Sequence, residues 1–169
     1  PTTDLPIIKI LWNSVLSTKG ARFMVADIEN FYLGTPMERP EYMRLPYKLI
    51  LQEIKDKYNL TDLEQDGWIF TKIIRGMYGL PQAGRLANLL LTKQLKKHGY
   101  YECQFTPSLW RHVWRSTTFA LVVDDFGIKF TGDSHANHLI NTLKRYYNVK
   151  VDTTGGLFVG IKLEWDYEK

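Results

Sequence analysis

The chain contains almost no cysteine and no long hydrophobic run. Cys103 is the single cysteine among 169 residues, which excludes an intramolecular disulfide and any cysteine-based zinc module. No segment reaches the roughly 18 consecutive apolar residues that a transmembrane helix needs, and the N-terminus lacks the pattern of a secretory signal. These absences predict an intracellular protein that is not secreted. Because the first residue is Pro1 rather than methionine, we also expect a fragment of a longer chain.

Acidic residues are missing from one long stretch. No Asp or Glu lies between Gly67 and Tyr101, although the net charge of the chain is only +4, so the remainder is slightly acidic. The cations of this stretch are Lys72, Arg75, Arg85, Lys93, Lys96 and Lys97. Such a basic block indicates either a surface for a phosphate backbone or an ordinary solvated helix face, and charge alone leaves both open.

The remaining composition, 44% hydrophobic and 24% charged, is typical of a folded domain. Apolar residues recur at helical spacing over residues 4–17, 48–57, 85–98 and 134–147. Shorter apolar or alternating runs predict strands over residues 22–26, 68–74, 109–115, 118–123, 126–131 and 157–165. Prolines and a glycine predict loops over residues 32–46. This order predicts an α+β domain in which helices pack on one face of a sheet.

Three aspartates lie at the ends of predicted strands. Asp27 follows an apolar strand, and Asp124 and Asp125 form the predicted turn of a hairpin. Adjacent residues on extended backbone point to opposite sides, so Asp27 meets the pair only if a turn bends it. Grouped carboxylates repel one another unless cations lie between them, and all-oxygen ligation favours Mg²⁺ or Mn²⁺ over zinc. The alternative is plain turn chemistry, because aspartate is a favoured turn residue.

Two further segments carry candidate residues. Residues 76–85, with the sequence GMYGLPQAGR, form a glycine-flanked loop before a predicted helix. Backbone N–H groups at a helix N-terminus attract anions, and Arg85 offers two hydrogen bonds to a phosphate. The second segment follows Asp27 and contains Phe31 and Tyr32, aromatic residues that suit either a core or a binding site.

Taken in order, these segments resemble the palm of reverse transcriptases, specifically those of Ty1/copia-type long-terminal-repeat retrotransposons. Asp27, with Tyr32 five residues later, is similar to the first catalytic motif of the family. Residues 77–85 are similar to the second motif, Leu-Tyr-Gly-Leu-x-Gln-Ala-x-Arg, and residues 122–125 lie where an aromatic-x-Asp-Asp box belongs. The resemblance covers about residues 5–165. It implies a palm-like antiparallel sheet and an RNA-directed DNA polymerase that extends a primer with deoxynucleotides.

The resemblance also implies a metal site. Asp27 and Asp124, with Asp125 beside them and the Ile28 carbonyl as a further ligand, would hold two Mg²⁺ ions, or Mn²⁺ in their place. Such ions lower the pKa of a primer 3′-hydroxyl and stabilise the departing pyrophosphate. The chain departs from the family at Val122, where an aromatic is usual, and we expect this change to affect the primer terminus rather than metal binding.

Four residues are implied to form the nucleotide-binding site. Tyr32 would lie under the incoming sugar and exclude a 2′-hydroxyl, and Gln82 would contact the incoming nucleotide. Phe31 replaces a frequent alanine and would add bulk beside this pocket. Arg85 and the helix after it would support the template side.

Lysines would complete the site. Lys93, Lys96 and Lys97 would contact the backbone of a template–primer duplex, which gives salt-sensitive affinity without sequence preference. The general acid of the family is a lysine near the fourth motif, a place that Lys150 or Lys144 would fill. The alternative for each of them is a solvated surface lysine, which we favour for either one taken separately.

The resemblance further implies a domain plan and partners. Residues 1–169 would be one reverse transcriptase fragment, a palm with part of the fingers, without the thumb and RNase H regions of the parent polyprotein. The implied partners are an RNA or DNA template with its primer, deoxynucleotides and those missing regions, with no membrane. The implied location is the cytoplasm, a virus-like particle or the nucleus.

Two other hypotheses remain. A helix-backed sheet with exposed aromatic residues is also the plan of an RNA-recognition domain, so the chain fits a non-catalytic nucleic-acid-binding or assembly module. The other hypothesis is a degenerate retrotransposon, whose protein product still folds but has lost its catalytic activity. The three aspartates separate these hypotheses from an enzyme, because a pure RNA binder gains nothing from acidic groups near phosphates.

Overall fold

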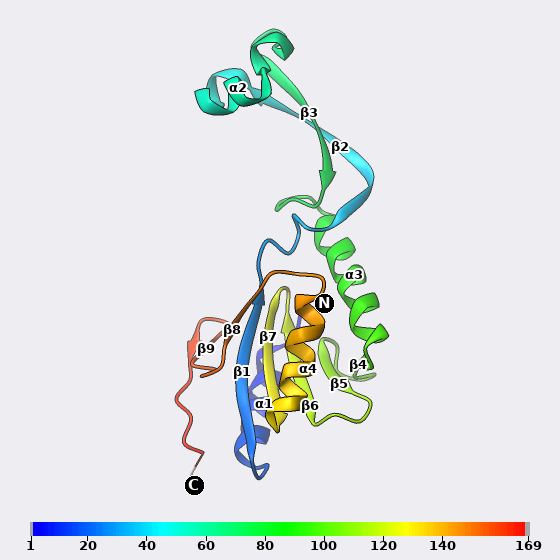
Figure 1. Cartoon of the computed structure of the whole chain (residues 1–169), viewed down its shortest axis with the longest axis vertical. Helices are drawn as coiled ribbons and strands as arrows, with labels where there is room; N and C mark the ends of the chain where they lie inside the picture. The colour runs from blue at the N-terminus through cyan, green and yellow to red at the C-terminus, as the bar shows by residue number, and fades with distance from the viewer. Residues whose placement is uncertain (1, 168–169) are drawn as a thin grey trace. The chain divides into compact units, whose positions relative to one another are not determined.

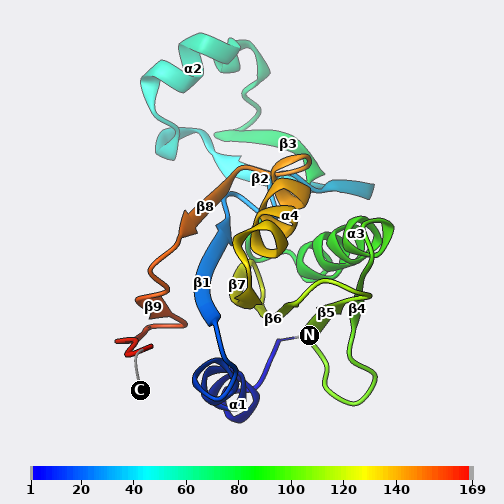
Figure 2. The same ribbon diagram turned by 60° about the horizontal axis from the view of Figure 1, so that its bottom comes forward.

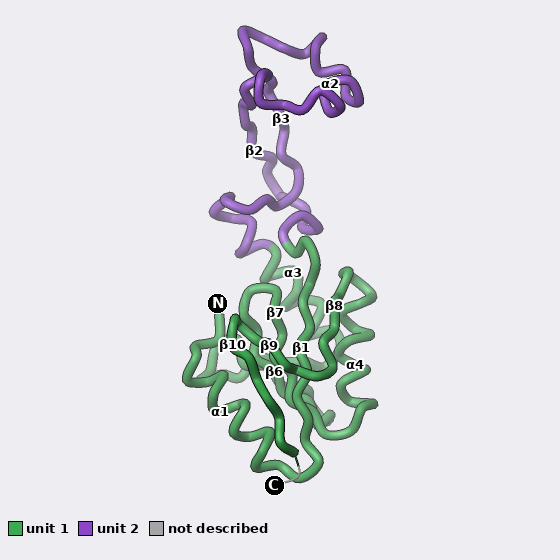
Figure 3. The backbone as a smooth tube through the Cα atoms, turned by 90° about the vertical axis from the view of Figure 1, so that its left-hand side faces the viewer, with its two compact units in different colours: residues 1–31, 87–169 green, residues 32–86 purple. Residues whose placement is uncertain are grey.

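The computed structural model describes residues 2–167 and divides them into two compact units. Unit 1 is formed by Pro1–Phe31 and Ala87–Lys169, and unit 2 by Tyr32–Leu86 (Figure 3). Within residues 2–167, no helix has the length and apolar character to cross a membrane.

Unit 1 is built on a six-stranded antiparallel sheet with the strand order β4-β5-β6-β7-β1-β8 (Figure 1). Its strands are β1 (Ala21–Ile28), β4 (Tyr100–Glu102), β5 (Leu109–His112), β6 (Thr117–Val122), β7 (Asp125–Thr131) and β8 (Val149–Asp152). The helices α1 (Leu5–Leu16) and α4 (Asp133–Lys144) pack against this sheet, and α3 (Ala83–Lys97) begins in unit 2 and continues into unit 1. The predicted α+β class is confirmed.

The core of unit 1 forms around β1, which lies between β7 and β8. Its alternate residues Phe23 and Val25 belong to one apolar cluster with Ile8, Leu11 and Val15 of α1. Met24 and Ala26, which point to the other face, are also buried, so β1 is apolar on both faces. A strand of this kind needs cover on both sides of the sheet.

The helices accordingly cover both faces, and the prediction of helices on one face is wrong. On the α1 side, Lys129 of β7 donates a hydrogen bond from Nζ to the Ser14 carbonyl oxygen at 2.8 Å. On the other side, the Thr117 hydroxyl of β6 donates to the His135 carbonyl oxygen of α4 at 3.1 Å. Figure 2 shows α1 and α4 on opposite sides of the sheet.

Unit 2 consists of a two-stranded antiparallel ribbon, β2 (Pro36–Pro46) and β3 (Trp68–Arg75), together with α2 (Gln52–Tyr58). Two short 3₁₀ helices, Tyr47–Leu49 and Leu60–Leu63, flank α2. The prediction of loops over residues 32–46 is wrong for β2. β2 tolerates prolines because it pairs with a neighbouring strand along one edge only. The shift of register between Pro36 and Glu41 also interrupts the ladder near Pro40.

Three short segments also differ from the predicted strands. The sequence pattern did not indicate β4 or β8, which have only three and four residues. Residues 157–165 form a small hairpin of β9 (Leu157–Phe158) and β10 (Ile161–Lys162) instead of one strand. Positive φ angles at Val159 and Gly160, 48° and 78°, reverse the chain between them.

Candidate active site

Two carboxylates face each other across the sheet. Asp27 near the end of β1 is the direct partner of Asp125, the first residue of β7. Directly opposed residues of an antiparallel pair share one face, with Cβ atoms roughly 4.5–5.5 Å apart. Asp27 alternates with Phe23 and Val25, whose side chains pack against α1. Asp27 and its partner Asp125 therefore lie on the face of the sheet that α1 covers. The sequence pattern left the meeting of Asp27 with the pair open, and the strand register brings Asp27 opposite Asp125.

The hairpin turn brings Asp124 to the same place. Val122 pairs with Asp125, so Val123 and Asp124 form the turn, one residue earlier than the predicted pair Asp124-Asp125. The Ile28 N–H donates to the Asp124 carbonyl oxygen at 3.1 Å and ties the turn to the end of β1. This bond also places the backbone of Ile28, the predicted further ligand, beside the turn.

Val123 has an unusual backbone conformation. Its φ is 60°, in the left-handed region that a β-branched residue rarely adopts. Two-residue hairpin turns require this conformation at their first position, where glycine, asparagine or aspartate is usual. A residue held there stores about 1–3 kcal/mol, and such strain clusters at functional sites.

The three carboxylates influence one another electrostatically. Burial, followed by the charges of Asp124 and Asp27, raises the pKa of Asp125 to about 6. Burial and, to a smaller extent, the charge of Asp27 also raise the pKa of Asp124. These shifts show negative charges that lie close together and are incompletely solvated.

The three aspartates do not form a closed cage. In the part of the chain that the structure describes, no group of three or more His, Cys, Asp or Glu side chains is arranged to hold a metal ion. The donor chemistry nevertheless fits a hard divalent cation, since every side-chain donor is a carboxylate oxygen. A cation between these groups would relieve the repulsion that raises the pKa of Asp125.

Lys150 and Glu29 flank the aspartates. Lys150 of β8 is the direct partner of Asp27, and its Nζ lies 2.6 Å from Glu29 Oε1. This hydrogen bond and the charge of Glu29 raise the pKa of Lys150, with a smaller contribution from Asp27. Lys150 is thus a paired, exposed cation beside the carboxylates, whereas Lys144 ends α4 on the other face of the sheet. The sequence analysis did not single out Glu29 as a site residue. Its position two residues after Asp27 was the available signal, because alternate residues of an extended chain lie on the same side.

Two glycines of the segment over residues 76–85 pack around Tyr32. The Tyr32 ring packs edge-on against Tyr78, with 4.8 Å between the ring centroids. A Cβ at Gly76 would lie 2.5 Å from the Tyr32 carbonyl oxygen, and one at Gly84 would lie 3.5 Å from Tyr32 Oη. The loop therefore closes around Tyr32, which the motif spacing alone did not reveal.

The two polar residues of this motif lie at the start of α3. Gln82 donates a hydrogen bond from Nε2 to Glu41 Oε1 of β2 at 2.6 Å. Arg85 is exposed in the first turn of α3, which has no acidic residue. An exposed guanidinium in the first turn of a helix is suited to bind an anion.

Phe31 differs from its prediction. Its side chain is 2% exposed and packs on Tyr147 with 6.0 Å between the ring centroids. This is the environment of a core residue in unit 1, so the ring does not add bulk to a surface pocket.

The lysines of α3 are all available to solvent. Lys93, Lys96 and Lys97 are exposed, and α3 has no acidic residue to neutralise them. Lys96 and Lys97 lie in the last turn, where cations also stabilise the helix dipole. Both interpretations of the basic block remain compatible with this placement.

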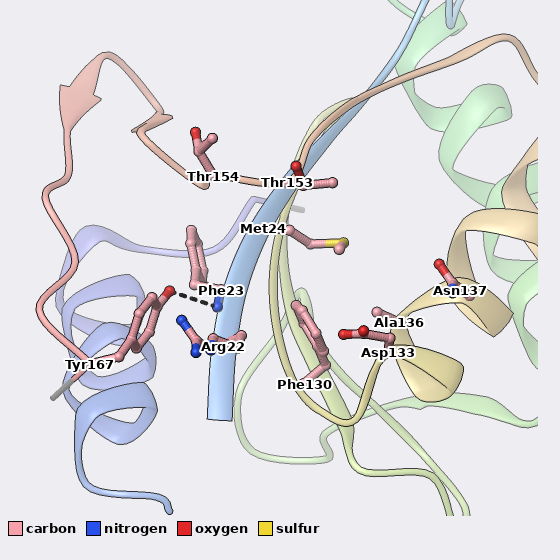
Figure 4. Close-up of a pocket in the computed structure, with 10 residues that line it drawn as sticks. All are labelled: Arg22, Phe23, Met24, Phe130, Asp133, Ala136, Asn137, Thr153, Thr154 and Tyr167. Atoms are coloured by element: carbon pink, nitrogen blue, oxygen red, sulfur yellow. Dashed lines mark hydrogen bonds between the residues drawn. The ribbon is translucent and has the colours of Figure 1, made fainter. Parts of the chain in front are cut away.

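A separate pocket of about 640 Å³ lies away from the aspartates in unit 1 (Figure 4). Tyr167 lies at its rim, where its Oη accepts a hydrogen bond from the Phe23 N–H at 3.1 Å. The Arg22 guanidinium stacks over the Tyr167 ring, 4.3 Å from its centroid. None of the predicted site residues lines this pocket.

No model of a known protein family matches the chain, and no curated protein sequence matches it. The function proposed for the chain therefore depends on its motifs and on the arrangement of the residues described above.

Proposed function

We propose that this chain is the core of an RNA-directed DNA polymerase of the Ty1/copia retrotransposon type, with a palm-like sheet in unit 1. The observation that carries the proposal is the pairing of Asp27 with Asp125, with Asp124 in the adjoining hairpin turn. Nucleotidyl transfer by divalent cations needs carboxylates on neighbouring strands at one position. The antiparallel sheet supplies that position through its register.

In the proposed reaction, Asp27, Asp124 and Asp125 hold divalent cations. Bound Mg²⁺ lowers the pKa of the primer 3′-hydroxyl and neutralises charge on the leaving pyrophosphate. The strained turn at Val123 fixes the backbone of Asp124, so the carboxylate needs little reorganisation when the substrates bind. Lys150 lies beside Glu29 and Asp27, and we propose that it exchanges the Glu29 carboxylate for the pyrophosphate and acts there as general acid, because its pairing with Glu29 itself favours the protonated form.

The remaining roles follow from the motif resemblance. We propose that Tyr32 selects the sugar of the incoming nucleotide, and its packing against Tyr78 and Gly84 supports a fixed ring orientation. Gln82 would exchange its bond to Glu41 for a contact with the nucleotide. Arg85 and the α3 lysines would bind phosphates of the template and primer, and unit 2 would be part of the fingers.

A second candidate is a non-catalytic nucleic-acid-binding module. It is favoured by one observation, that within residues 2–167 the carboxylates form no three-ligand metal group. In that case the basic residues bind nucleic acid and the aspartates have no chemical task.

Primer extension separates the two candidates. The intact chain, alone and joined to the downstream regions that the resemblance implies, is given an RNA template with a DNA primer, deoxynucleotides and Mg²⁺ or Mn²⁺. The polymerase proposal predicts extension that EDTA abolishes. If both the chain alone and the chain joined to those regions bind the template but never extend the primer, the binding module is favoured.

A further inference from the structure

The ribbon of unit 2 has one exposed face that the proposed active site does not use. In an antiparallel pair, residues directly opposite each other share a face. One face therefore carries the pairs Tyr42–Lys72, Arg44–Phe70 and Pro46–Trp68. We call the first four of these residues the ribbon face. The alternate residues, among them Leu45 opposite Ile69, lie on the other face.

The ribbon face is exposed although it is rich in aromatic surface. Tyr42 is 74% exposed and Phe70 is 63% exposed, while Ile69 on the other face is only 2% exposed. Arg44 and Lys72 are exposed as well. Folding of unit 2 thus buries Ile69 on the opposite face and leaves two aromatic rings of the ribbon face in water, which is typical of a surface that binds a partner.

Charge indicates the kind of partner. The paired residues of this face include two cations and no acidic residue, and the two rings are diagonal neighbours between those cations. The Arg44 guanidinium stacks on Trp68, 4.5 Å from the ring centroid, which restricts its position while its N–H groups stay available for a phosphate. Aromatic rings beside cations are the combination that binds bases and phosphates together.

This face is distinct from the predicted nucleotide site. Glu41, the acidic residue that accepts the hydrogen bond of Gln82, pairs with Ile73 on the opposite face of the ribbon. The ribbon face is therefore not the surface that Gln82 contacts.

We propose that the ribbon face binds single-stranded nucleic acid, with bases stacked on Tyr42 and Phe70 and phosphates bound by Arg44 and Lys72. A single strand fits better than a duplex, because stacking on protein rings requires unpaired bases. A second copy of this chain fits less well, since a self-contact would bring the cations of two faces together without a carboxylate to pair with them.

Binding of a labelled oligonucleotide tests this proposal without catalysis. The affinity of the intact chain for a fluorescein-labelled oligo(U) or oligo(dT) strand is measured by anisotropy in EDTA. Tyr42→Ala and Phe70→Ala should each weaken binding about tenfold, while Tyr42→Phe and Phe70→Tyr should retain it. Arg44→Gln and Lys72→Gln should each reduce the slope of log affinity against log salt by about 0.7. Tyr58→Ala is the matched control, because Tyr58 is 58% exposed on α2 of the same unit.

The outcomes are distinct from those of the polymerase test. The binding assay contains EDTA and no deoxynucleotide, so loss of catalysis does not affect the result. Unchanged affinity in both alanine variants, or no binding by the unmodified chain, would overturn the proposal. A concentration-dependent dimer that both alanine variants abolish, with oligonucleotide affinity unchanged, would instead assign the face to contacts between copies.

Discussion

Asp27 of β1 and Asp125 of β7 are direct partners across an antiparallel ladder, so two negative charges share one face of the sheet. Like charges in this position destabilise a pair of strands. The raised pKa of Asp125 is the electrostatic consequence, because burial and the two neighbouring aspartates disfavour its ionised form. The fold therefore accepts a cost at this position that a bound cation would offset.

Magnesium should stabilise the chain through this pair. We expect saturating Mg²⁺ to raise the melting temperature by about 2–4 °C, equivalent to about 1 kcal/mol for a domain of this size. Asp27→Asn should remove most of that increase, since it removes one ligand. Differential scanning fluorimetry with and without Mg²⁺ measures the effect. Asp133→Asn, at an exposed carboxylate of α4, is the control, and an equal increase in Asp27→Asn would contradict the assignment.

Sugar selection should depend on the ring of Tyr32. In the proposed polymerase, Tyr32→Ala should admit ribonucleotides and lower the preference for deoxynucleotides by one to two orders of magnitude, about 1–3 kcal/mol. Tyr32→Phe should keep the preference because the ring remains. Single-nucleotide incorporation with each sugar measures it, and an unchanged preference in Tyr32→Ala would remove the proposed role.

Two glycines of the segment over residues 76–85 should respond differently to alanine. Gly76→Ala would bring its Cβ to 2.5 Å from the Tyr32 carbonyl oxygen, a backbone atom that cannot move aside cheaply. We expect it to lower the free energy of unfolding by about 2 kcal/mol or more. Gly84→Ala makes an ordinary contact at 3.5 Å in the first turn of α3, where alanine is the better helix former, so its effect should be neutral or stabilising by up to about 1 kcal/mol. Urea denaturation compares the two, and equal destabilisation would contradict this packing.

The four histidines of the chain gather in unit 1 near the ends of α3, α4 and β5. The ring of His112 is 5.3 Å from that of His138, and its Nε2 lies 3.1 Å from the His98 carbonyl oxygen. His112 Nδ1 accepts hydrogen bonds from the N–H groups of Trp114 and Arg115, at 3.2 and 3.1 Å. An acceptor at Nδ1 requires the neutral ring.

Stability should therefore fall in mild acid. Burial, with the charge of Arg115 contributing, lowers the pKa of both His112 and His138 below the ordinary value of 6.5. The unfolded chain then binds more protons than the folded one below about pH 6.5, so stability is present above that pH and is lost as the pH falls through it. The loss should be on the order of 1 kcal/mol by pH 5. His112→Asn keeps an acceptor without titrating, and urea denaturation from pH 5 to 8 should show a flatter profile for it; an equally steep profile would contradict the assignment.

The sequence was informative where burial and periodicity agree. The apolar run of β1 and the helical spacing of α1 and α4 predicted these elements, and the two carboxylate positions followed from strand ends. The pairing of Asp27 with Asp125 depends on the register between β1 and β7. The alternation of apolar residues restricts this register, but the sequence of one strand alone does not specify it.

Other features depend on interactions that no local pattern records. The prolines of β2 suggested loops because the one-edged pairing of the ribbon was not visible. The turn falls at Val123, a residue with poor propensity for positive φ, because the pairing of Val122 with Asp125 imposes it. Phe31 is a core residue because of its packing against Tyr147, which lies far away in the chain.

The central claim is that the paired aspartates carry nucleotidyl transfer. Its most direct test is the rate of incorporation of one deoxynucleotide on an RNA template with a DNA primer, in the chain joined to the downstream regions that the resemblance implies. Asp27→Asn and Asp124→Asn should each reduce this rate by about three orders of magnitude or more, about 4 kcal/mol in activation free energy, while Glu53→Gln on exposed α2 keeps it. Incorporation by Asp124→Asn within a few-fold of the unmodified protein would contradict the account.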